Sequence, residues 1–412
     1  MADTDARQAV ISCGEAARQA APGLAAAPGA VIDGALRQMA SLLAERAAII
    51  LDANEADMAR GTRQGLGRGL LDRLRLDEQR LAATARQLEL LAGVAFPPEA
   101  TPLGTLPDGL RLTERRVPIG VVGANFEARP AVTVDIASQL LKSHNAGVLR
   151  TGAAALASAA ALFDHAISPA LEKAGIGPRA LQLVRTADHA AAAELVRQPG
   201  LIPLVILRGS GETTRSLAAE AARHGVRTLA HADGGGVLYL DHAAEPAEAT
   251  RLITESLDRL GVCNRLNLLL ICSGRWDELL PVALGALATA GVAPSLPPHD
   301  HPLGREWALQ AGREATVTIA PVSDAVAAAR TANDETSGLA AGIVTSDPAA
   351  ARRFLDAYRG TGAFWNASTR LLDGFKLRGV PETGINVDHV PGPRGPVTFA
   401  DLCLRQYVVT PA

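Results

Sequence analysis

From residue 146 onward, short apolar runs alternate with longer stretches whose apolar residues follow a helical period. The pattern predicts strands at 146–152, 181–185, 201–211 and 237–241, and helices at 153–175, 188–198 and 212–225. The strands are apolar on both faces, which is typical of a sheet that helices cover on both sides. Repeated strand–helix–strand units of this kind predict a parallel, doubly wound α/β sheet.

The second half repeats this alternation less regularly. It predicts a helix at 247–260 ended by Gly261, strands at 266–271, 339–347 and 363–368, and a helix near 348–358. Residues 1–100 have helical periodicity, most clearly at 31–60 and 70–94. We therefore expect a Rossmann-type cofactor domain followed by an α/β catalytic domain.

Two exposed strands are predicted outside these sheets. Residues 110–117 alternate between polar and apolar after a Pro/Gly-rich connector at 97–109, and 402–409 form another apolar, strand-like run. Exposed strand edges are usually paired or covered. We expect the two segments to form a small oligomerisation sheet shared between subunits, which makes the protein at least a dimer.

Charge and cysteine usage narrow the class of protein. The formal net charge of −3 leaves no basic excess, so no nucleic-acid partner is expected. Cysteines at 13, 263, 272 and 403 have no CxxC spacing and no histidine cluster, so we expect no metal and a reducing cytoplasm. The N-terminal segment has no apolar signal core, and no uncharged apolar run reaches about 18 residues, so no membrane span is expected.

Cys263 is the candidate nucleophile. It lies in GVCNR, between a predicted helix and a predicted buried strand, and such a junction places a side chain at the edge of a sheet. A buried structural cysteine is the alternative. A helix C-terminus directly before it would raise the pKa of the thiol, so activation has to come from cofactor, substrate or residues distant in sequence.

Glycine turns and charged residues follow the predicted strands. The run from Arg208 to Gly211 joins a strand to a helix, which suits a backbone cradle for phosphate, although a tight turn would have the same sequence. A second glycine turn lies in HADGGGVLYLD (231–241). Glu127 and Arg129 follow the buried strand before NFEARP, where they form either a surface pair or a binding site.

Taken together, these segments resemble γ-glutamyl phosphate reductase (glutamate-5-semialdehyde dehydrogenase), a family of the aldehyde dehydrogenase superfamily. The similarity extends over nearly the whole chain. It is carried by GLLDRLRLDEQRL (69–81), RVPIGVVGANFEARPAVTVD (116–135), LKSHNAGVLR (141–150), LVILRGSG (204–211), HADGGGVLYLD (231–241), VCN (262–264), NASTRLLDGF (366–375), ETGI (382–385) and RGP (394–396).

The resemblance implies an NADPH-dependent reductase of an acyl phosphate, with L-glutamyl 5-phosphate as substrate in a reaction of the proline-biosynthesis type. The thiolate of Cys263 would attack the acyl carbon and expel phosphate, and hydride transfer would then reduce the thioester. The backbone N–H of Cys263 is a candidate oxyanion donor. A homo-oligomer is implied, and the kinase that makes the acyl phosphate is a further candidate partner.

The matching segments also assign roles to individual residues. The catalytic residues are Cys263 and Asn264. The substrate-binding residues are Glu127, Arg129, Ser368, Thr369, Arg370 and Arg394, with Arg129 at the phosphate and Arg370, aided by Ser368, at the α-carboxylate. The cofactor-binding residues are Arg150, Arg208, Gly209, Ser210, Gly211, Asp233, Gly234, Gly235 and Glu382.

One segment favours phosphate exchange over hydrolysis. Hydrolytic aldehyde dehydrogenases carry a water-activating glutamate in a Glu-Leu-Gly-Gly segment, and here the matching residues read His231-Ala232-Asp233-Gly234-Gly235. An enzyme that exchanges its thioester with phosphate needs no such base. The sequence therefore favours a reductase.

Departures from the family pattern leave two alternatives open. Ala131 stands where the family has asparagine, and Leu339 where it has histidine. These losses suit a paralogous aldehyde dehydrogenase or acyl-phosphate reductase with another substrate, which includes one that releases a free acid. They also suit a catalytically silent scaffold, against which Cys263 and the glycine turns argue.

The resemblance also implies a division of the chain. Residues 1–108 and 123–250 would form the cofactor-binding domain, and residues 251–388 the catalytic domain. Residues 109–122 and 389–412 would be the oligomerisation segments.

Overall fold

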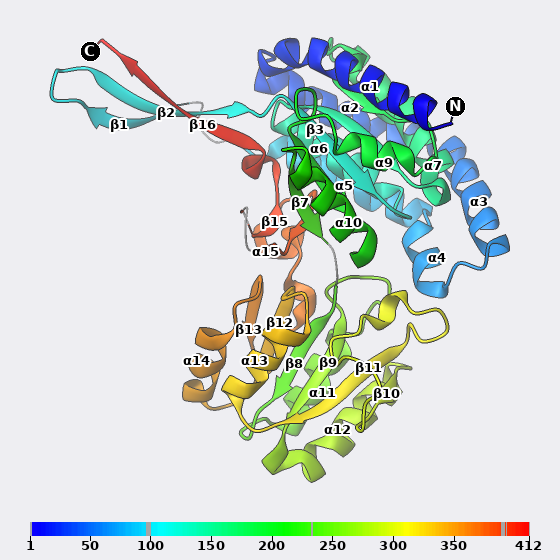
Figure 1. Cartoon of the computed structure of the whole chain (residues 1–412), viewed down its shortest axis with the longest axis vertical. Coiled ribbons are helices and arrows are strands. Elements are labelled where there is room, and N and C mark those ends of the chain that lie inside the picture. The colour runs from blue at the N-terminus through cyan, green and yellow to red at the C-terminus, as the bar shows by residue number, and fades with distance from the viewer. Residues whose placement is uncertain (1, 96–99, 232–233, 389–391, 393, 412) are drawn as a thin grey trace.

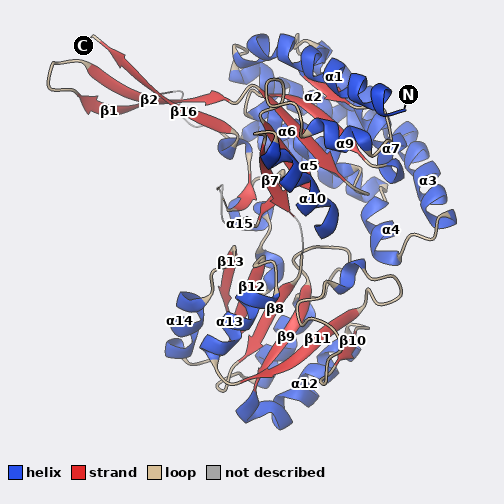
Figure 2. Cartoon of the chain, in the orientation of Figure 1, coloured by secondary structure: helices blue, strands red, loops and turns tan. Residues whose placement is uncertain are grey.

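The computed structural model of the chain describes residues 2–95, 100–231, 234–388, 392 and 394–411. Within these residues the chain forms two lobes and a projecting arm (Figure 1). The first lobe contains a five-stranded parallel sheet and the second a six-stranded parallel sheet, and helices surround both (Figure 2). The arm is a three-stranded antiparallel ribbon that leaves the side of the first lobe.

The N-terminal helices pack in the first lobe. They are α1 (Ala2–Ala25), α2 (Gly29–Glu45), α3 (Ala47–Arg63), α4 (Arg68–Leu74) and α5 (Glu78–Gly93). The helical run expected at 70–94 is therefore broken between α4 and α5. Asp77 caps α5 by accepting a bond from the N–H of Arg80 at 2.8 Å. Asn54 of α3 stabilises the connection between α4 and α5, because its side chain donates to the Leu74 carbonyl (2.9 Å) and accepts from the Leu76 N–H (2.7 Å).

The first sheet has the strand order β5-β4-β3-β6-β7, and every pairing is parallel. Its strands are β3 (Val121–Phe126), β4 (Ala146–Thr151), β5 (Leu181–Leu183), β6 (Leu204–Arg208) and β7 (Arg227–His231). The helices of this part are α6 (Ala131–Lys142), α7 (Leu156–Leu162), α8 (Ser168–Lys173), α9 (Ala190–Leu195) and α10 (Gly211–Arg223). This order confirms the predicted doubly wound sheet. The order reverses between β3 and β6, and ligands of such sheets bind beyond the carboxyl ends of the strands at that point.

The second sheet has the order β10-β11-β9-β8-β12-β13. Its strands are β8 (Gly236–Leu240), β9 (Leu266–Cys272), β10 (Ala293–Ser295), β11 (Thr316–Val322), β12 (Ala340–Val344) and β13 (Gly362–Trp365). The helices are α11 (Pro246–Glu255), α12 (Trp276–Thr289), α13 (Ala325–Glu335) and α14 (Pro348–Ala357). Alternate residues of β8 face opposite sides, as the two-residue period of a strand requires. Leu238 and Leu240 pack with α11 and α12, whereas Val237 and Tyr239 pack with α13 and α14.

The division between the lobes differs from the one drawn on the sequence. Residues 236–250, expected in the cofactor domain, lie in the second lobe, because β8 pairs with β9 and β12. The division falls between β7 and β8, and the predicted boundary at residue 250 is therefore wrong. The spacing of strands along a sequence does not reveal which of two sheets a strand joins.

The arm consists of β1 (Ala100–Thr105), β2 (Arg111–Pro118) and β16 (Cys403–Thr410) in the order β1-β2-β16. The two predicted exposed strands therefore pair with each other within one chain, and β1, expected as connector, adds a third. The side chains of Leu404 and Tyr407 on β16 are 52% and 58% exposed. Whether the arm is shared between subunits stays a prediction.

A small two-stranded sheet, β14 (Gly384–Asn386) with β15 (Gly395–Val397), follows the short helix α15 (Gly374–Arg378). Its Val387 donates to the carbonyl of Ala230 at the end of the first sheet (3.3 Å). One described helical run, Ala153–Lys173, is long and apolar enough to cross a membrane, but 56% of its most apolar window is buried inside the protein.

Candidate active site

Cys263 lies in a turn between α11 and β9. A helix end was expected directly before the thiol, at residue 260. Helix α11 instead ends at Glu255, eight residues before Cys263. The cysteine is half-buried and packs against an apolar cluster that includes Leu339 and Leu372. Because it precedes β9, it lies at the amino edge of the second sheet. Among the described cysteines none forms a disulfide.

The glycine turn before β8 supports the backbone of this cysteine. Gly235 donates its N–H to the carbonyl oxygen of Cys263 and Gly236 to that of Arg265, each over 2.6 Å. A methyl group on Gly234 would lie 2.7 Å from the Cys263 oxygen and 2.8 Å from its Cα. Gly234 and Gly235, expected to bind cofactor, therefore have a packing role at the nucleophile. Asp233, assigned with them, lies outside the described residues.

The segment 368–372 braces the same turn from the other side. Asn264 donates to the carbonyl of Leu372 (2.8 Å), and Thr369 donates to the carbonyl of Asn264 (2.8 Å). The guanidinium of Arg370 bonds to the side chains of Asn264 and Asp258. Ser368, expected to assist Arg370, bonds instead to the hydroxyl of Ser256 (2.9 Å). The polar groups expected to meet substrate here already have protein partners.

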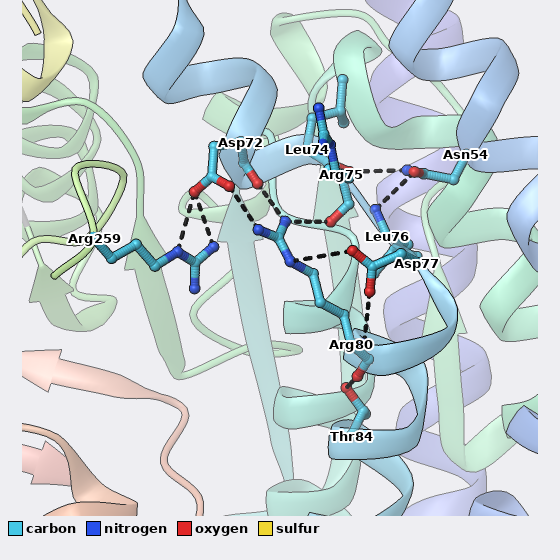
Figure 3. A network of polar contacts seen from close by, with 9 residues as sticks. All are labelled: Asn54, Asp72, Leu74, Arg75, Leu76, Asp77, Arg80, Thr84 and Arg259. Atoms are coloured by element: carbon cyan, nitrogen blue, oxygen red, sulfur yellow. Dashed lines mark hydrogen bonds and ion pairs between the residues drawn. The ribbon is translucent and has the colours of Figure 1, made fainter.

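Helix α4 of the first lobe contacts this turn as well. Arg73 donates from Nε to the carbonyl oxygen of Gly261 over 2.7 Å. Beside it, Asp72 bonds to Arg80 of its own lobe (2.6 Å) and to Arg259 of the second lobe (3.0 Å), as Figure 3 shows. These arginines hold the pKa of the Asp72 carboxyl below its usual value, although burial opposes them. The nucleophile turn is thus held from both lobes.

Arg129 follows β3, directly after Ala128, whose φ of 46° is unusual for a residue with a side chain. Among the described residues its guanidinium has neither a hydrogen bond nor an ion pair with protein. Burial, together with the nearby Arg73 and Arg208, lowers the pKa of Arg129 to about 9, and Cys263 opposes this shift. An unpaired guanidinium among other guanidiniums is a site for an anion.

The glycine loop after β6 lies next to this arginine. Arg208 is the last residue of β6, and α10 begins at Gly211. Glu127 accepts a bond from the N–H of Ser210 at 3.2 Å, so its carboxylate already occupies part of the cradle. A methyl group on Gly209 would lie 3.1 Å from the carboxyl carbon of Glu127. The loop therefore lies at the switch point between β3 and β6.

Two carboxyl groups near the turn have perturbed protonation. Burial raises the pKa of Glu382 to about 7, with Asp373 and Cys263 adding to the shift and Arg208 opposing it. Burial also raises the pKa of Asp135, on α6, to about 6. Groups of this kind gather at functional sites because they change protonation near neutral pH.

These side chains surround two adjoining hollows. The larger, of about 310 Å³, is near the lower limit for small-molecule sites and is lined by Arg73, Arg129, Asp135, Arg208, Val262 and Glu382, among others. The smaller, of about 210 Å³, is lined by Arg73, Glu127, Arg129, Arg208, Gly209 and Ser210, among others. The three shared arginines separate them, at the carboxyl edge of the first sheet and next to the Cys263 turn.

Two predicted site residues lie elsewhere. Arg150 is 2% exposed and bonds to the Asn125 side chain (3.1 Å) and the Asp188 carbonyl (3.0 Å), so it braces strand ends inside the first lobe. Arg394 donates to the carbonyls of Val387 (3.0 Å) and Arg359, which ties the small sheet to the second lobe. Neither lines the two hollows.

Comparison with known proteins places this geometry in a family. Residues 2–299 match the aldehyde dehydrogenase family. The chain is 38% identical to the γ-glutamyl phosphate reductase of Clavibacter michiganensis subsp. michiganensis, over 96% of this chain and 92% of that protein. It is 37% identical to the same enzyme of Anaeromyxobacter dehalogenans, over 96% and 94%. The chain belongs to the γ-glutamyl phosphate reductase family.

Solved structures agree with this family membership. The crystal structure of γ-glutamyl phosphate reductase from Thermotoga maritima superposes with a TM-score of 0.86 at 27% identity and covers 97% of this chain and 98% of that one. An acetylating aldehyde dehydrogenase from Geobacillus thermoglucosidasius shares the fold, with a TM-score of 0.76 at 15% identity and coverage of 100% and 98%. The predicted aldehyde dehydrogenase-like fold is confirmed.

The aldehyde dehydrogenase fold implies a nicotinamide cofactor, and the smaller hollow suits a phosphate of such a cofactor. It lies at the N-terminus of a 13-residue helix, α10, where unpaired N–H groups attract phosphate. Arg208 adds positive charge, and Gly209 lets a ligand approach the backbone closely. A dinucleotide phosphate would therefore be held by the loop 208–211.

The sequence reading missed three residues at this site. Arg73 lies in a stretch that was interpreted only as helix, Asp135 in one that was assigned no secondary structure, and Glu306 in a loop without a recognised motif. Glu306 accepts a bond from the N–H of Gly234 at 3.0 Å, beside the Cys263 backbone. The signal for Arg73 and Asp135 was their presence in two of the segments that carry the family resemblance.

Proposed function

We propose that the chain is an NADPH-dependent reductase of L-glutamyl 5-phosphate that works through a thioester on Cys263. The observation that supports this most strongly is that the unpaired guanidinium of Arg129 interacts electrostatically with Cys263 and lines, with further arginines, a hollow next to the Cys263 turn. An acyl phosphate brings both an electrophilic carbon and an anionic leaving group. The names of the relatives supply the glutamyl phosphate substrate, and the family resemblance implies the connection to proline biosynthesis.

The first step uses the residues of the turn. The sulfur of Cys263, as thiolate, bonds to the acyl carbon, and the bond from that carbon to the phosphate oxygen breaks, so phosphate leaves with the electron pair. Arg129 neutralises the charge on the leaving phosphate. The backbone N–H of Cys263 is the proposed donor to the acyl oxygen. Gly234, Gly235, Asn264, Thr369 and Arg370 hold the turn in position.

A bound reduced nicotinamide cofactor supplies the hydride that converts the thioester to the aldehyde level. The carbon–sulfur bond then breaks, Cys263 leaves as thiolate and the semialdehyde is released. Glu382, whose pKa of about 7 lets its carboxyl group bind or release a proton near neutral pH, is close enough for its charge to interact with Cys263. It is suited to keep the thiol deprotonated before attack. This replaces its expected role in cofactor binding.

The lobes take separate roles in this proposal. The first lobe binds the dinucleotide at the switch point of its sheet, and the second supplies the nucleophile. The arm joins subunits into at least a dimer through the exposed edge strand β16. We place the protein in the cytoplasm, in keeping with cysteines that form no disulfides among the described residues. Contact with the upstream kinase stays a prediction.

The test runs the reaction in reverse. Purified protein, NADP⁺ and phosphate are combined with a panel of semialdehydes, and the absorbance of reduced cofactor is followed. We expect reduction only with glutamate 5-semialdehyde and only with phosphate present, and a higher kcat/KM with NADP⁺ than with NAD⁺. Equal activity without phosphate contradicts the acyl-phosphate reaction.

Glu306 favours a second candidate, an aldehyde dehydrogenase that releases a free acid. Its carboxylate lies beside Gly234 and Cys263, although the motif glutamate of hydrolytic enzymes is missing. A carboxylate there can activate water. Phosphate-independent oxidation that Glu306→Gln abolishes supports this candidate, whereas unchanged phosphate-dependent turnover in that variant rejects it.

A further inference from the structure

Asp135 differs from the other carboxyl groups on the larger hollow. Asp373 accepts bonds from the N–H groups of Phe375 (3.0 Å) and Lys376 (3.1 Å), and Glu382 accepts one from Gly374 (2.7 Å). The side chain of Asp135 has no hydrogen bond or ion pair with any described residue. Its carboxyl group is therefore available to a ligand.

The position of Asp135 is costly without a ligand. The Asp135 side chain is half-buried, and a carboxylate removed from water without a partner is destabilised, so burial raises the pKa of Asp135 to about 6. Arg208 and Arg129 oppose this shift, so both lie within electrostatic range, yet neither forms an ion pair with Asp135. The protein thus holds opposite charges near one another on the hollow without letting them neutralise each other.

Such an arrangement complements a zwitterion. An α-amino acid carries an ammonium and a carboxylate on one carbon, and these require a carboxylate and a guanidinium side by side. The charge of Cys263 interacts with Arg129, which puts the reactive end of a substrate at Arg129. Arg208 lies within electrostatic range of Asp135 and lines the same hollow, so these two side chains can hold the other end of the substrate.

We propose that Asp135 binds the α-ammonium group of the substrate, with Arg208 at its α-carboxylate, so that Asp135 makes the larger hollow selective for an amino acid over the corresponding dicarboxylic acid. The inference rests on the proposed acyl-phosphate reaction and adds the residue that selects the substrate. The structural alternative is that Asp135 only balances the positive charge of the arginines.

A pair of ligands isolates the ammonium group. L-glutamate and glutarate differ only in the α-amino group, and neither can react, so their binding does not depend on turnover. Titration calorimetry of the full chain should give a lower Kd for L-glutamate than for glutarate. Asp135→Asn should raise the Kd for L-glutamate about 10- to 100-fold, the loss typical of a hydrogen bond to a charged group, and leave the Kd for glutarate unchanged or lower.

Matched variants separate recognition from charge balance. Asp373→Asn also removes a negative charge from the hollow, but its carboxylate caps α15, so it should keep the preference for L-glutamate. Asp135→Glu retains the charge and should keep part of the preference. Circular dichroism checks the fold of each variant. The proposal is overturned if Asp135→Asn raises the Kd for L-glutamate and for glutarate by the same factor. It is also overturned if Asp373→Asn reduces the preference for L-glutamate as much as Asp135→Asn does.

Turnover supplies the second measurement. The kcat/KM for glutamate 5-semialdehyde, relative to 5-oxopentanoate, should drop about 10- to 100-fold in Asp135→Asn. A wild-type chain that binds both acids equally, or neither, refutes the ammonium site even if the enzyme is active. Selective binding without phosphate-dependent turnover rejects the acyl-phosphate reaction and retains Asp135 as an ammonium site.

Discussion

The side chain of Arg73, in the first lobe, donates a hydrogen bond of 2.7 Å to the backbone oxygen of Gly261, two residues before Cys263. Cys263, the proposed nucleophile, belongs to the second lobe, but the turn that carries it is bonded to a helix of the first. The interaction between Asp72 and Arg259 reinforces this contact (Figure 3).

Replacing Arg73 by methionine should lower kcat at least about tenfold, because a nucleophile that is misplaced by a fraction of an ångström reacts slowly. The apolar stem of the side chain is kept, so the melting temperature should change little. Arg75→Met is the matched control, since Arg75 lines the same hollow but is exposed and makes no bond to the turn. Equal kcat values for the two variants contradict the positioning role.

Gly234→Ala should reduce activity at least about a hundredfold, because the added methyl group would lie 2.7 Å from the Cys263 oxygen and has to displace the turn. Gly34→Ala provides the contrast. It lies within α2 with nothing within 4 Å of the new methyl group, and should raise the free energy of unfolding by about 0.5–1 kcal/mol without a change in turnover. Steady-state kinetics and urea unfolding measure both effects. Full activity in Gly234→Ala would falsify the role of the glycine turn.

Cys263→Ser should abolish turnover while the fold and cofactor binding persist, since a hydroxyl is a far weaker nucleophile than a thiolate. Cys13, Cys272 and Cys403 should each tolerate alanine in the activity assay. Fluorescence titration with NADPH tests cofactor binding in every variant. As much as a tenth of the parent rate in Cys263→Ser is incompatible with the covalent mechanism.

Glu382 gives stability a dependence on pH. Its ordinary pKa of 4.5 rises to about 7 in the folded chain, so between these values the folded chain binds more protons than the unfolded one. The free energy of unfolding consequently decreases as pH rises through this window. Glu382→Gln removes this contribution, so its free energy of unfolding relative to wild type should be about 3 kcal/mol higher at pH 8 than at pH 4.5. Urea unfolding at both pH values provides the measurement, and an identical difference at each pH rules out the raised pKa.

The arm should hold subunits together. Leu404 and Tyr407 are large, exposed side chains on an edge strand, so placing a charge at each should oppose burial of that strand against a partner. The double variant Leu404→Glu/Tyr407→Glu should give a monomer by light scattering at micromolar concentration. Arg405→Glu changes charge on the same strand without removing apolar surface and serves as the control. A monomeric wild-type protein refutes the arrangement.

Local sequence patterns identified the turn that contains Cys263 and most strands of both parallel sheets, but not β7, β10 or β11. Apolar periodicity carries this information because each buried strand has to be apolar along its whole length. The partners of individual charged side chains could not be predicted. Arg129 and Arg370 lie in equally convincing segments, yet Arg370 bonds to Asp258 and Asn264, and Arg129 has no protein partner among the described residues. That difference depends on contacts between residues far apart in sequence.

The allocation of strands was the other failure. Strand β8 follows β7 closely in sequence but pairs in the second sheet, and only tertiary packing decides between two sheets of similar character. Asp135 shows the same limit on a smaller scale. Its helix was not predicted, and nothing local indicates that its carboxyl group lies within electrostatic range of arginines from other elements.

The pairing of β16 with β2 has a consequence for biogenesis. Both parallel sheets lie between the two strands in sequence, so a ribosome completes these sheets before the arm can close. Such distant contacts form late because they carry a large loop-closure cost. Until β16 arrives, β2 exposes an unpaired edge next to a folded lobe. If the arm joins subunits as proposed, chains interrupted before residue 403 would be unable to associate, and assembly itself would discriminate finished subunits from unfinished ones.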